Sequence, residues 1–222
     1  MDKVVHSIFP TAVMEFKLPF DTATIKTQLE TYNSQLKPHA VFDGNATTTT
    51  DEAFHLLADP QFDGLRIEFD KCIKEYSEVM GFKPQTIQNS WFNVMNKGAT
   101  LGPHVHRASI ISGGYYPKCP EGSVGLTFKS PLEPYNKINL TRLAKDLVSH
   151  IYEDFKSFEL YDKDTEYNAK ECTFPVNEGH LLLWPSWFQH ETKVNNTNER
   201  YVISFNTIST MKKGNYAKYE QS

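Results

Sequence analysis

Two segments near the N-terminus carry apolar residues every three or four positions, which is the spacing of a helix with one buried face. The first helix is expected between Asp21, a possible N-cap, and Pro38, which cannot continue a helix. The second is expected to begin at Pro60 and to end at Gly81. The apolar faces consist of Ile25, Leu29, Tyr32 and Leu36 in the first segment and of Leu65, Phe69, Cys72, Ile73, Tyr76 and Met80 in the second. Residues 1–85 are therefore predicted to form a largely helical region that packs on the rest of the chain.

From residue 86 onward, the helical spacing gives way to short stretches rich in β-branched and aromatic residues. Turn-forming residues, such as those at 96–98 and 177–179, separate these stretches. The predicted strands span residues 85–95, 109–116, 124–128, 171–176, 180–187, 190–194 and 200–209. Many short strands with frequent breaks favour a mainly β fold with flanking helices, an antiparallel sandwich or jelly roll, over residues 86–210.

An insertion at residues 132–170 interrupts the strand pattern. Within it, residues 138–155 have apolar positions at helical spacing, so a helix is expected there. Because the insertion falls between the two halves of the candidate metal site described below, we expect a mobile lid over that site. A helix packed permanently on the barrel is the alternative. Residues 211–222 are predicted to form a polar tail.

The composition is that of a globular protein without a strong charge bias. The 222 residues include 23 Lys and Arg against 27 Asp and Glu, for a formal net charge of -4. Without a basic surplus, no nucleic-acid partner is expected. The N-terminus lacks the apolar block of a signal peptide, no apolar run is long enough to span a bilayer, and the three cysteines are widely spaced. These features predict a cytoplasmic protein with no membrane partner, and they carry no signal for its oligomeric state.

His104 and His106 form an H-x-H pair that is a candidate for metal binding. On a strand, residues i and i+2 point to the same face, so two imidazoles at this spacing can bind one ion. Taken alone, the pair is more typical of two surface or hydrogen-bonded histidines at the start of a strand. His190 lies on another predicted strand and supplies a possible third ligand.

Arg200 opens the last predicted strand, ten residues after His190. Alternation places one set of side chains on the inner face and another on the outer face. The two sets are Arg200, Val202, Ser204 and Asn206, and Tyr201, Ile203 and Phe205. An arginine on an inward, otherwise apolar face needs an anionic partner, because an unpaired buried charge is very unfavourable. A surface arginine paired with Glu199 or Glu191 is the alternative.

Five short motifs follow one another in a fixed order over residues 86–210. They are Asn89-Ser90-Trp91, the pair His104-x-His106, Ser112-Gly113-Gly114-Tyr115-Tyr116, the stretch from Gly179 to His190, and the stretch from Arg200 to Asn206. In this order they resemble a branch of the Fe(II)/2-oxoglutarate-dependent oxygenases. The resemblance covers more than half of the chain.

The resemblance implies a double-stranded β-helix, the jelly-roll or cupin-like fold, with helices on one side. It implies a non-haem Fe(II)- and 2-oxoglutarate-dependent dioxygenase. Such an enzyme uses O2 to hydroxylate a small molecule or a protein side chain and releases succinate and CO2. It also implies that His104, His106 and His190 bind Fe(II).

The resemblance further implies where 2-oxoglutarate binds. The cosubstrate would chelate the iron, and its C5 carboxylate would pair with Arg200, whose planar guanidinium can form two parallel hydrogen bonds with a carboxylate. Tyr116 stands where a related hydroxylase subgroup places a tyrosine on this carboxylate, and Ser204 and Asn93 would complete the polar lining. The three tryptophans near the site, Trp91, Trp184 and Trp187, are expected to pack within the barrel.

His106 departs from the usual pattern of the family, because most members carry a carboxylate at this position. Three imidazoles also suit zinc or the all-histidine iron sites of cupin dioxygenases. A cupin-type metalloenzyme that does not use 2-oxoglutarate would explain the histidines but not Arg200. A non-enzymatic jelly-roll binding or virion protein is the third interpretation.

Overall fold

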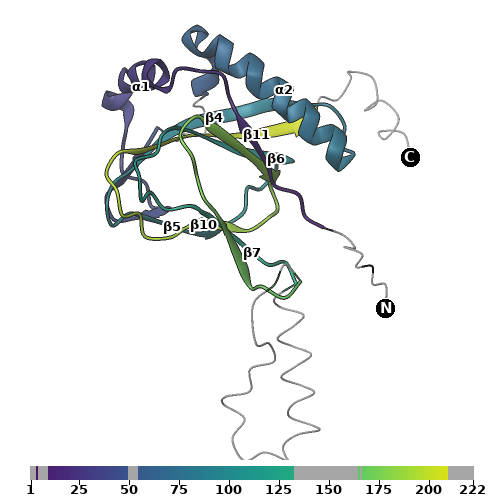
Figure 1. Cartoon of the computed structure of the whole chain (residues 1–222). Helices are drawn as coiled ribbons and strands as arrows, with labels where there is room; N and C mark the ends of the chain where they lie inside the picture. The colour runs from purple at the N-terminus through teal and green to yellow at the C-terminus, as the bar shows by residue number, and fades with distance from the viewer. Residues whose placement is uncertain (1–3, 5–9, 50–54, 133–164, 166, 210–222) are drawn as a thin grey trace, which may run out of the picture.

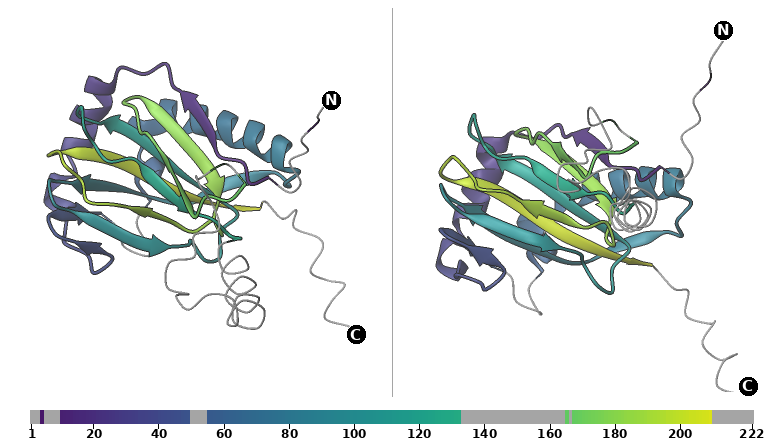
Figure 2. Two further views of the ribbon diagram at one scale, coloured as in Figure 1. Left: turned by 60° about the horizontal axis from the view of Figure 1, so that its bottom comes forward. Right: turned by 90° about the horizontal axis from the view of Figure 1, so that it is seen from below.

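The computed structural model consists of two antiparallel β-sheets that face each other, with helices on the outer side of the larger sheet (Figures 1 and 2). It describes residue 4 and residues 10–49, 55–132, 165 and 167–209. In these residues the larger sheet has the strand order β1 (Met14–Lys17), β9 (His180–Pro185), β6 (Ile111–Lys118), β11 (Arg200–Ser209), β4 (Gln85–Met95) and β3 (Ala46–Thr48). The smaller sheet has the order β2 (Phe42–Asp43), β5 (Thr100–His104), β10 (His190–Thr192), β7 (Leu126–Lys129) and β8 (Glu171–Phe174). The predicted mainly β architecture with flanking helices is confirmed.

The helices begin close to where the sequence predicts. Asp21 caps α1 (Thr22–Glu30) by accepting hydrogen bonds from two main-chain N–H groups of the first turn. The helix ends earlier than expected, and a 3-10 turn, η1 (Asn33–Gln35), follows it. Two further 3-10 turns, η2 (Leu56–Ala58) and η3 (Pro60–Phe62), precede α2 (Asp63–Met80). Gly81 ends α2 with a φ of 68°, a left-handed conformation that glycine adopts without strain.

The strand β11 divides its side chains between two environments, as the alternation predicts. Tyr201, Ile203 and Phe205 belong to the core between the larger sheet and the helices. Arg200 and Val202 point to the opposite face, toward the smaller sheet, and are also buried. Figure 1 shows α2 lying across the outer face of this sheet, near β4, β6 and β11. The helices therefore support the sheet from behind and leave its inner face to form a cavity.

The N-terminal region differs from the prediction, because it also contributes three short strands. β1 pairs with β9, β2 pairs with β5, and β3 pairs with β4, so residues from this region extend both sheets. These strands have two to four residues, too few to produce a readable alternation. The predicted helix at 138–155, most of the insertion at 132–170 and the tail at 211–222 lie outside the described residues.

Among the described residues, no helix combines the length and the apolar character needed to cross a bilayer.

The ring of Phe205 packs over a glycine on the neighbouring strand. Phe205 on β11 and Gly113 on β6 are direct partners in the sheet. The phenyl ring is fully buried and stacks on Phe69 of α2 with 5.0 Å between the ring centres. A Cβ atom added to Gly113 would lie 2.3 Å from Cζ of this ring, which is far inside van der Waals contact. The absence of a side chain at position 113 therefore lets the ring lie flat between sheet and helix.

We expect Gly113→Ala to lower the free energy of unfolding by about 1–3 kcal/mol, the range for overpacked cores. Gly64→Ala on α2 is the matched control, because its added Cβ would reach its nearest neighbour, Phe20, only at 3.8 Å. That substitution is expected to leave stability unchanged or to raise it, since alanine is the better helix former. Denaturant unfolding followed by circular dichroism measures both variants. Equal stability of the two would contradict the packing described here.

Candidate metal centre

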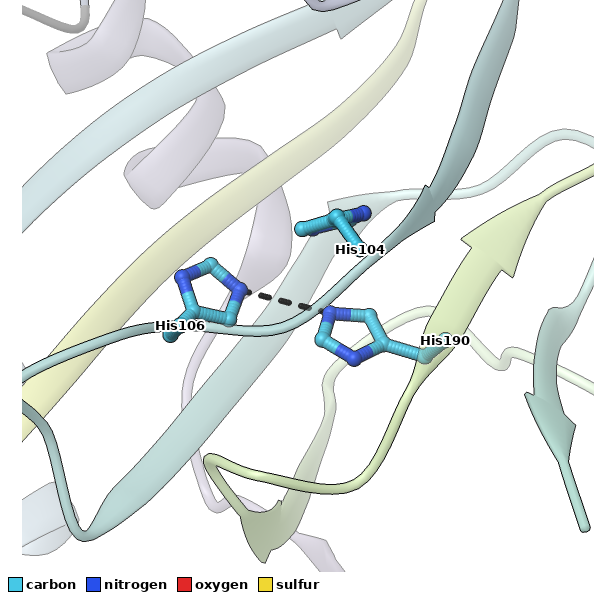
Figure 3. Close-up of side chains that lie close together, drawn as sticks. All are labelled: His104, His106 and His190. Atoms are coloured by element: carbon cyan, nitrogen blue, oxygen red, sulfur yellow. Dashed lines mark hydrogen bonds between the residues drawn. The ribbon is translucent and has the colours of Figure 1, made fainter. Parts of the chain in front are cut away.

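Three histidines meet between the two sheets (Figure 3). His104 is the last residue of β5 and His190 the first of β10, and the two are direct partners in the antiparallel pairing of these strands. His106 follows β5 by two residues. One ring nitrogen from each histidine can be chosen so that all three lie within 4.8 Å of one another. The Nε2 atoms of His106 and His190 are 3.3 Å apart. This geometry brings three nitrogen donors to one point, as a bound metal ion requires.

Main-chain carbonyl groups fix the rings of two of these histidines. The Nδ1–H of His104 donates to the carbonyl oxygen of Gly102, and the Nδ1–H of His190 donates to that of Phe188, each at 2.9 Å. A proton on Nδ1 leaves the Nε2 lone pair free, which is the tautomer that binds a metal through Nε2. The hydrogen bonds therefore select both the orientation and the protonation state of the two rings.

The pKa values of the three rings favour the neutral, metal-binding form. Burial, and secondarily the neighbouring His104, lowers the pKa of His106 to about 4 and that of His190 to about 3. Burial also lowers the pKa of His104. A neutral imidazole keeps the lone pair that coordination needs, so the rings are in the binding state at neutral pH.

His106 lies outside the strand ladder, in contrast to the single-strand geometry predicted for the H-x-H pair. Its main-chain N–H donates to the carbonyl oxygen of Ser186 at 3.0 Å. Two residues later Ala108 has a φ of 56°, which is a strained conformation for a residue other than glycine. The loop that carries His106 therefore turns sharply, and the imidazole reaches the other two rings from this loop rather than from a pleated strand.

A chain of buried and half-buried hydroxyl groups connects this loop to the larger sheet. The Oγ atom of Ser186 lies 2.8 Å from the Oγ atoms of both Ser109 and Ser112. Ser109 follows His106 in the loop and also donates to the carbonyl oxygen of Thr207 on β11. Ser112 donates to Oδ1 of Asn206. These bonds attach the loop to β6, to β11 and to Ser186, the residue that follows β9.

The histidines lie in a cavity of about 650 Å³, a size typical of small-molecule sites. The inner face of the larger sheet contributes Asn93, Tyr116, Arg200 and Ser204 to its lining, and the smaller sheet contributes His104 and His190. The structure thus brings all seven residues predicted for the site, His106 included, into one cavity. No Asp or Glu of the described residues lines it.

Among the described residues that line the cavity, Arg200 is the only arginine or lysine. The side chain is 1% exposed, and one of its terminal nitrogens contacts the sulfur of Met95 at 3.3 Å. Its Nε has no hydrogen-bond partner, and no carboxylate in the described part of the chain pairs with it. Glu199 pairs instead with Lys118, and Glu191 pairs with Lys129, so the surface alternative considered for Arg200 is wrong. A buried, unpaired cation of this kind needs an anion from outside the described chain.

The other predicted polar residues surround Arg200. The ring centre of Tyr116 is 5.1 Å from Cζ of Arg200, and burial, partly opposed by Arg200, raises the pKa of this tyrosine to about 12. The phenol is therefore protonated at neutral pH. Nδ2 of Asn93 donates to Oγ of Ser204 at 3.0 Å, which connects the neighbouring strands β4 and β11 inside the cavity.

Some residues of the cavity were not predicted from the sequence. His39, Val41 and Phe42 line its mouth, because β2 pairs with β5 and places Phe42 beside Leu101. No motif marks this stretch, so only the pairing reveals it. Of the three tryptophans, Trp184 is buried as expected, but it also lines the cavity, with its ring centre 4.9 Å from that of His190. Trp91 lines the cavity near His106, and Trp187 is exposed.

Solved structures of similar architecture include several oxygenases. A prolyl-4-hydroxylase from Pseudomonas putida matches with a TM-score of 0.56 at 13% identity, over 90% of this chain and 94% of its own. HygX from Streptomyces hygroscopicus, solved with nickel, 2-oxoglutarate and hygromycin B, matches with a TM-score of 0.57 at 14% identity, over 90% of this chain and 84% of its own. A viral collagen prolyl hydroxylase from Paramecium Bursaria Chlorella virus-1, in complex with 2-oxoglutarate, matches with a TM-score of 0.54 at 10% identity, over 89% and 96%. At these identities the likeness concerns the fold, which is the double-stranded β-helix predicted from the sequence.

The sequence itself carries a family match. A search of curated proteins finds no match to the chain. Residues 89–206, which include the three histidines and Arg200, match the family described as "Putative 2OG-Fe(II) oxygenase". The family's cofactors are Fe(II) and 2-oxoglutarate, and the donor set suits both, since three neutral imidazoles offer nitrogen ligands and the unpaired Arg200 offers a carboxylate partner. The match covers more than half of the chain, and the chain therefore belongs to this family of Fe(II)- and 2-oxoglutarate-dependent oxygenases.

Proposed function

We propose that this protein hydroxylates a substrate with O2 and 2-oxoglutarate, and that His104, His106 and His190 hold the Fe(II) ion. One observation carries the proposal: three convergent imidazoles share a cavity with a buried arginine that lacks an anionic partner. A metal site alone would fit a cupin, but it would leave Arg200 without a role. The family match favours the oxygenase over the cupin-type and non-enzymatic interpretations.

The chemistry is divided between the cofactors and the chain. Fe(II) and 2-oxoglutarate, when bound, supply an oxidation in which O2 is consumed, 2-oxoglutarate is converted to succinate and CO2, and a substrate carbon gains a hydroxyl group. The chain supplies the geometry. His104 and His190 present Nε2 from paired strands, with ring orientations fixed by the carbonyl oxygens of Gly102 and Phe188. His106 presents its imidazole from the adjoining loop.

Arg200 would bind the C5 carboxylate of 2-oxoglutarate. Its guanidinium is buried on the same sheet face as Ser204 and can hold a carboxylate through two parallel N–H bonds. Tyr116, protonated and next to the guanidinium, would donate a further hydrogen bond to the same carboxylate. Ser204 and Asn93, which bond to each other, would form the polar wall between Arg200 and the metal. The guanidinium itself is buried, which excludes water from it and strengthens these electrostatic contacts.

The substrate is a small molecule or a protein side chain. A volume of about 650 Å³ accommodates 2-oxoglutarate together with a group of moderate size. The structural neighbours include an enzyme solved with the small molecule hygromycin B and a collagen prolyl hydroxylase, so the fold serves both classes.

The activity is tested with protein purified and loaded with Fe(II) under anaerobic conditions. We expect one equivalent of metal per chain and release of succinate from 2-oxoglutarate after O2 is admitted, even without the natural substrate. Metal-loaded protein that neither binds 2-oxoglutarate nor releases succinate would refute the oxygenase assignment for this chain.

His104→Ala, His106→Ala and His190→Ala are each expected to weaken binding of one divalent ion sharply, because each removes one nitrogen donor. Calorimetric titration of the full chain with Ni(II), which is stable in air, measures the affinity. His180→Ala is the matched control, since His180 bonds to Glu15 at the surface and lies outside the cavity. Stoichiometric binding that survives His190→Ala would contradict a site built from both β5 and β10.

Arg200→Ala is expected to leave metal content intact and to weaken 2-oxoglutarate binding by roughly 2–5 kcal/mol, the usual effect of truncating one side of a buried charge pair. Lys118→Ala removes a cation from the neighbouring strand β6, where it pairs with Glu199, and serves as the control. Anaerobic calorimetry measures the 2-oxoglutarate affinity of both variants. Unchanged affinity in the Arg200 variant would show that the cosubstrate is held elsewhere.

Ser186→Ala is expected to lower Ni(II) affinity about tenfold, the lower end of the range for residues that orient a metal ligand. The substitution removes the hydroxyl that joins Ser109 to Ser112, so the loop that carries His106 loses its side-chain hydrogen bond to Ser186. Ser123→Ala, which removes a hydroxyl bonded to Thr197 outside the cavity lining, is the control. Equal Ni(II) affinity of the two variants would mean that the hydroxyl chain does not position His106.

A further inference from the structure

The charges of the proposed site do not balance. The three histidines would bind the metal as neutral imidazoles, because coordination uses the lone pair of an unprotonated ring nitrogen, so a bound Fe(II) ion would keep both of its positive charges. Arg200 adds a third positive charge. 2-Oxoglutarate, a dianion, compensates two of the three. One positive charge remains, and a carboxylate in place of His106 would have compensated it.

Among the described residues, no other group near the proposed metal position supplies the missing negative charge. The cavity lining formed by the described residues contains neither Asp nor Glu. Glu191, next to His190 in sequence, bonds to Lys129 at 2.7 Å, and Lys129 in turn bonds to Glu171 at 2.6 Å. Glu171 also pairs with Lys193, so this network holds two positive and two negative charges and has no net charge. An uncompensated charge in a cavity of this kind is unfavourable and attracts an anion.

We propose that the substrate carries a negatively charged group, a carboxylate or a phosphate, that lies in this cavity beside the metal. The inference rests on the function proposed above, because it counts the charges of Fe(II) and 2-oxoglutarate. The excess charge is at the metal end of the cavity, since the C5 carboxylate already compensates Arg200. The substrate anion would therefore lie on the side of His106 and Trp91, whose ring centres are 5.9 Å apart.

The attraction is large enough to select one substrate class over another. A single charge about 6 Å from the excess charge, at an effective dielectric constant of about 20–40, binds roughly tenfold to a hundredfold more tightly than a neutral group of the same shape. Neutral isosteres of the substrate would therefore bind poorly.

Acetate and acetamide provide the test, because they share size and planar shape but differ by one charge. The full chain is loaded anaerobically with Fe(II) and saturating 2-oxoglutarate, and each probe is titrated while the relaxation of its methyl protons is followed by NMR. Paramagnetic iron speeds this relaxation only at short range, so the signal reports both affinity and proximity to the metal. We expect acetate to bind at least tenfold more tightly than acetamide. Equal affinities, or bound acetate without iron-enhanced relaxation, would overturn the proposal.

His106→Asp adds the missing negative charge at the metal, and we expect it to reduce acetate affinity at least tenfold, to about that of acetamide. Val79→Asp is the control, because it places the same charge on the exposed side of α2, outside the cavity lining, where water screens it. It should change acetate affinity less than threefold. His106→Glu repeats the measurement with a longer side chain if the aspartate variant loses iron. A preference for acetate that persists in an iron-loaded His106 carboxylate variant would overturn the proposal.

Failure of this inference and failure of the oxygenase assignment give different results. Binding of 2-oxoglutarate to the iron-loaded chain is measured first. If the cosubstrate does not bind, the assignment fails and the charge argument falls with it. If it binds and the chain then treats acetate and acetamide alike, only the inference about an anionic substrate is overturned.

Discussion

The candidate metal centre depends on the register between two short strands. His190 lies directly opposite His104 because β10 pairs antiparallel with β5. A shift of this pairing by one residue would turn one of the two imidazoles to the opposite face of the sheet. β10 has only three residues, too few to determine its register alone. Its pairing with β5 on one side and with β7 on the other holds it in register.

The larger sheet contributes the opposite side of the cavity. One of its strands, β11, contacts both the helices on the outer face and the cavity on the inner face. On β11, residues that face the helices alternate with residues that face the cavity. Tyr201, Ile203 and Phe205 anchor the strand in the core, and Arg200 and Val202 project from its other face. The position of the guanidinium is therefore coupled to packing on the far side of the sheet, including the contact between Phe205 and Gly113.

The sequence predicts the features that depend on local periodicity and on motif order. Alternation along residues 200–206 is a local property, so the face that carries Arg200 could be predicted without knowing its neighbours. The short strands of the N-terminal region could not, because β1 is defined by its pairing with β9, from Met14 to Leu183, rather than by its own four residues. The same limit applies to His106, where a turn through Ala108 replaces the expected strand. The charge balance of the cavity also required the structure, since only contacts show that Glu191 and Glu199 are paired elsewhere.

The three histidines are held in unequal ways, and this has a kinetic consequence. His104 and His190 are direct partners in a strand pairing within the smaller sheet, whereas His106 lies on a loop joined to Ser186 by main-chain bonds at His106 and Ile110 and by a chain of hydroxyls. Loops of this kind open locally with less free energy than paired strands. Dissociation of a bound ion would thus begin with the loop and pass through a species that the two strand histidines still hold. The rate of metal exchange would then depend on the opening of one loop rather than on the global stability of the fold.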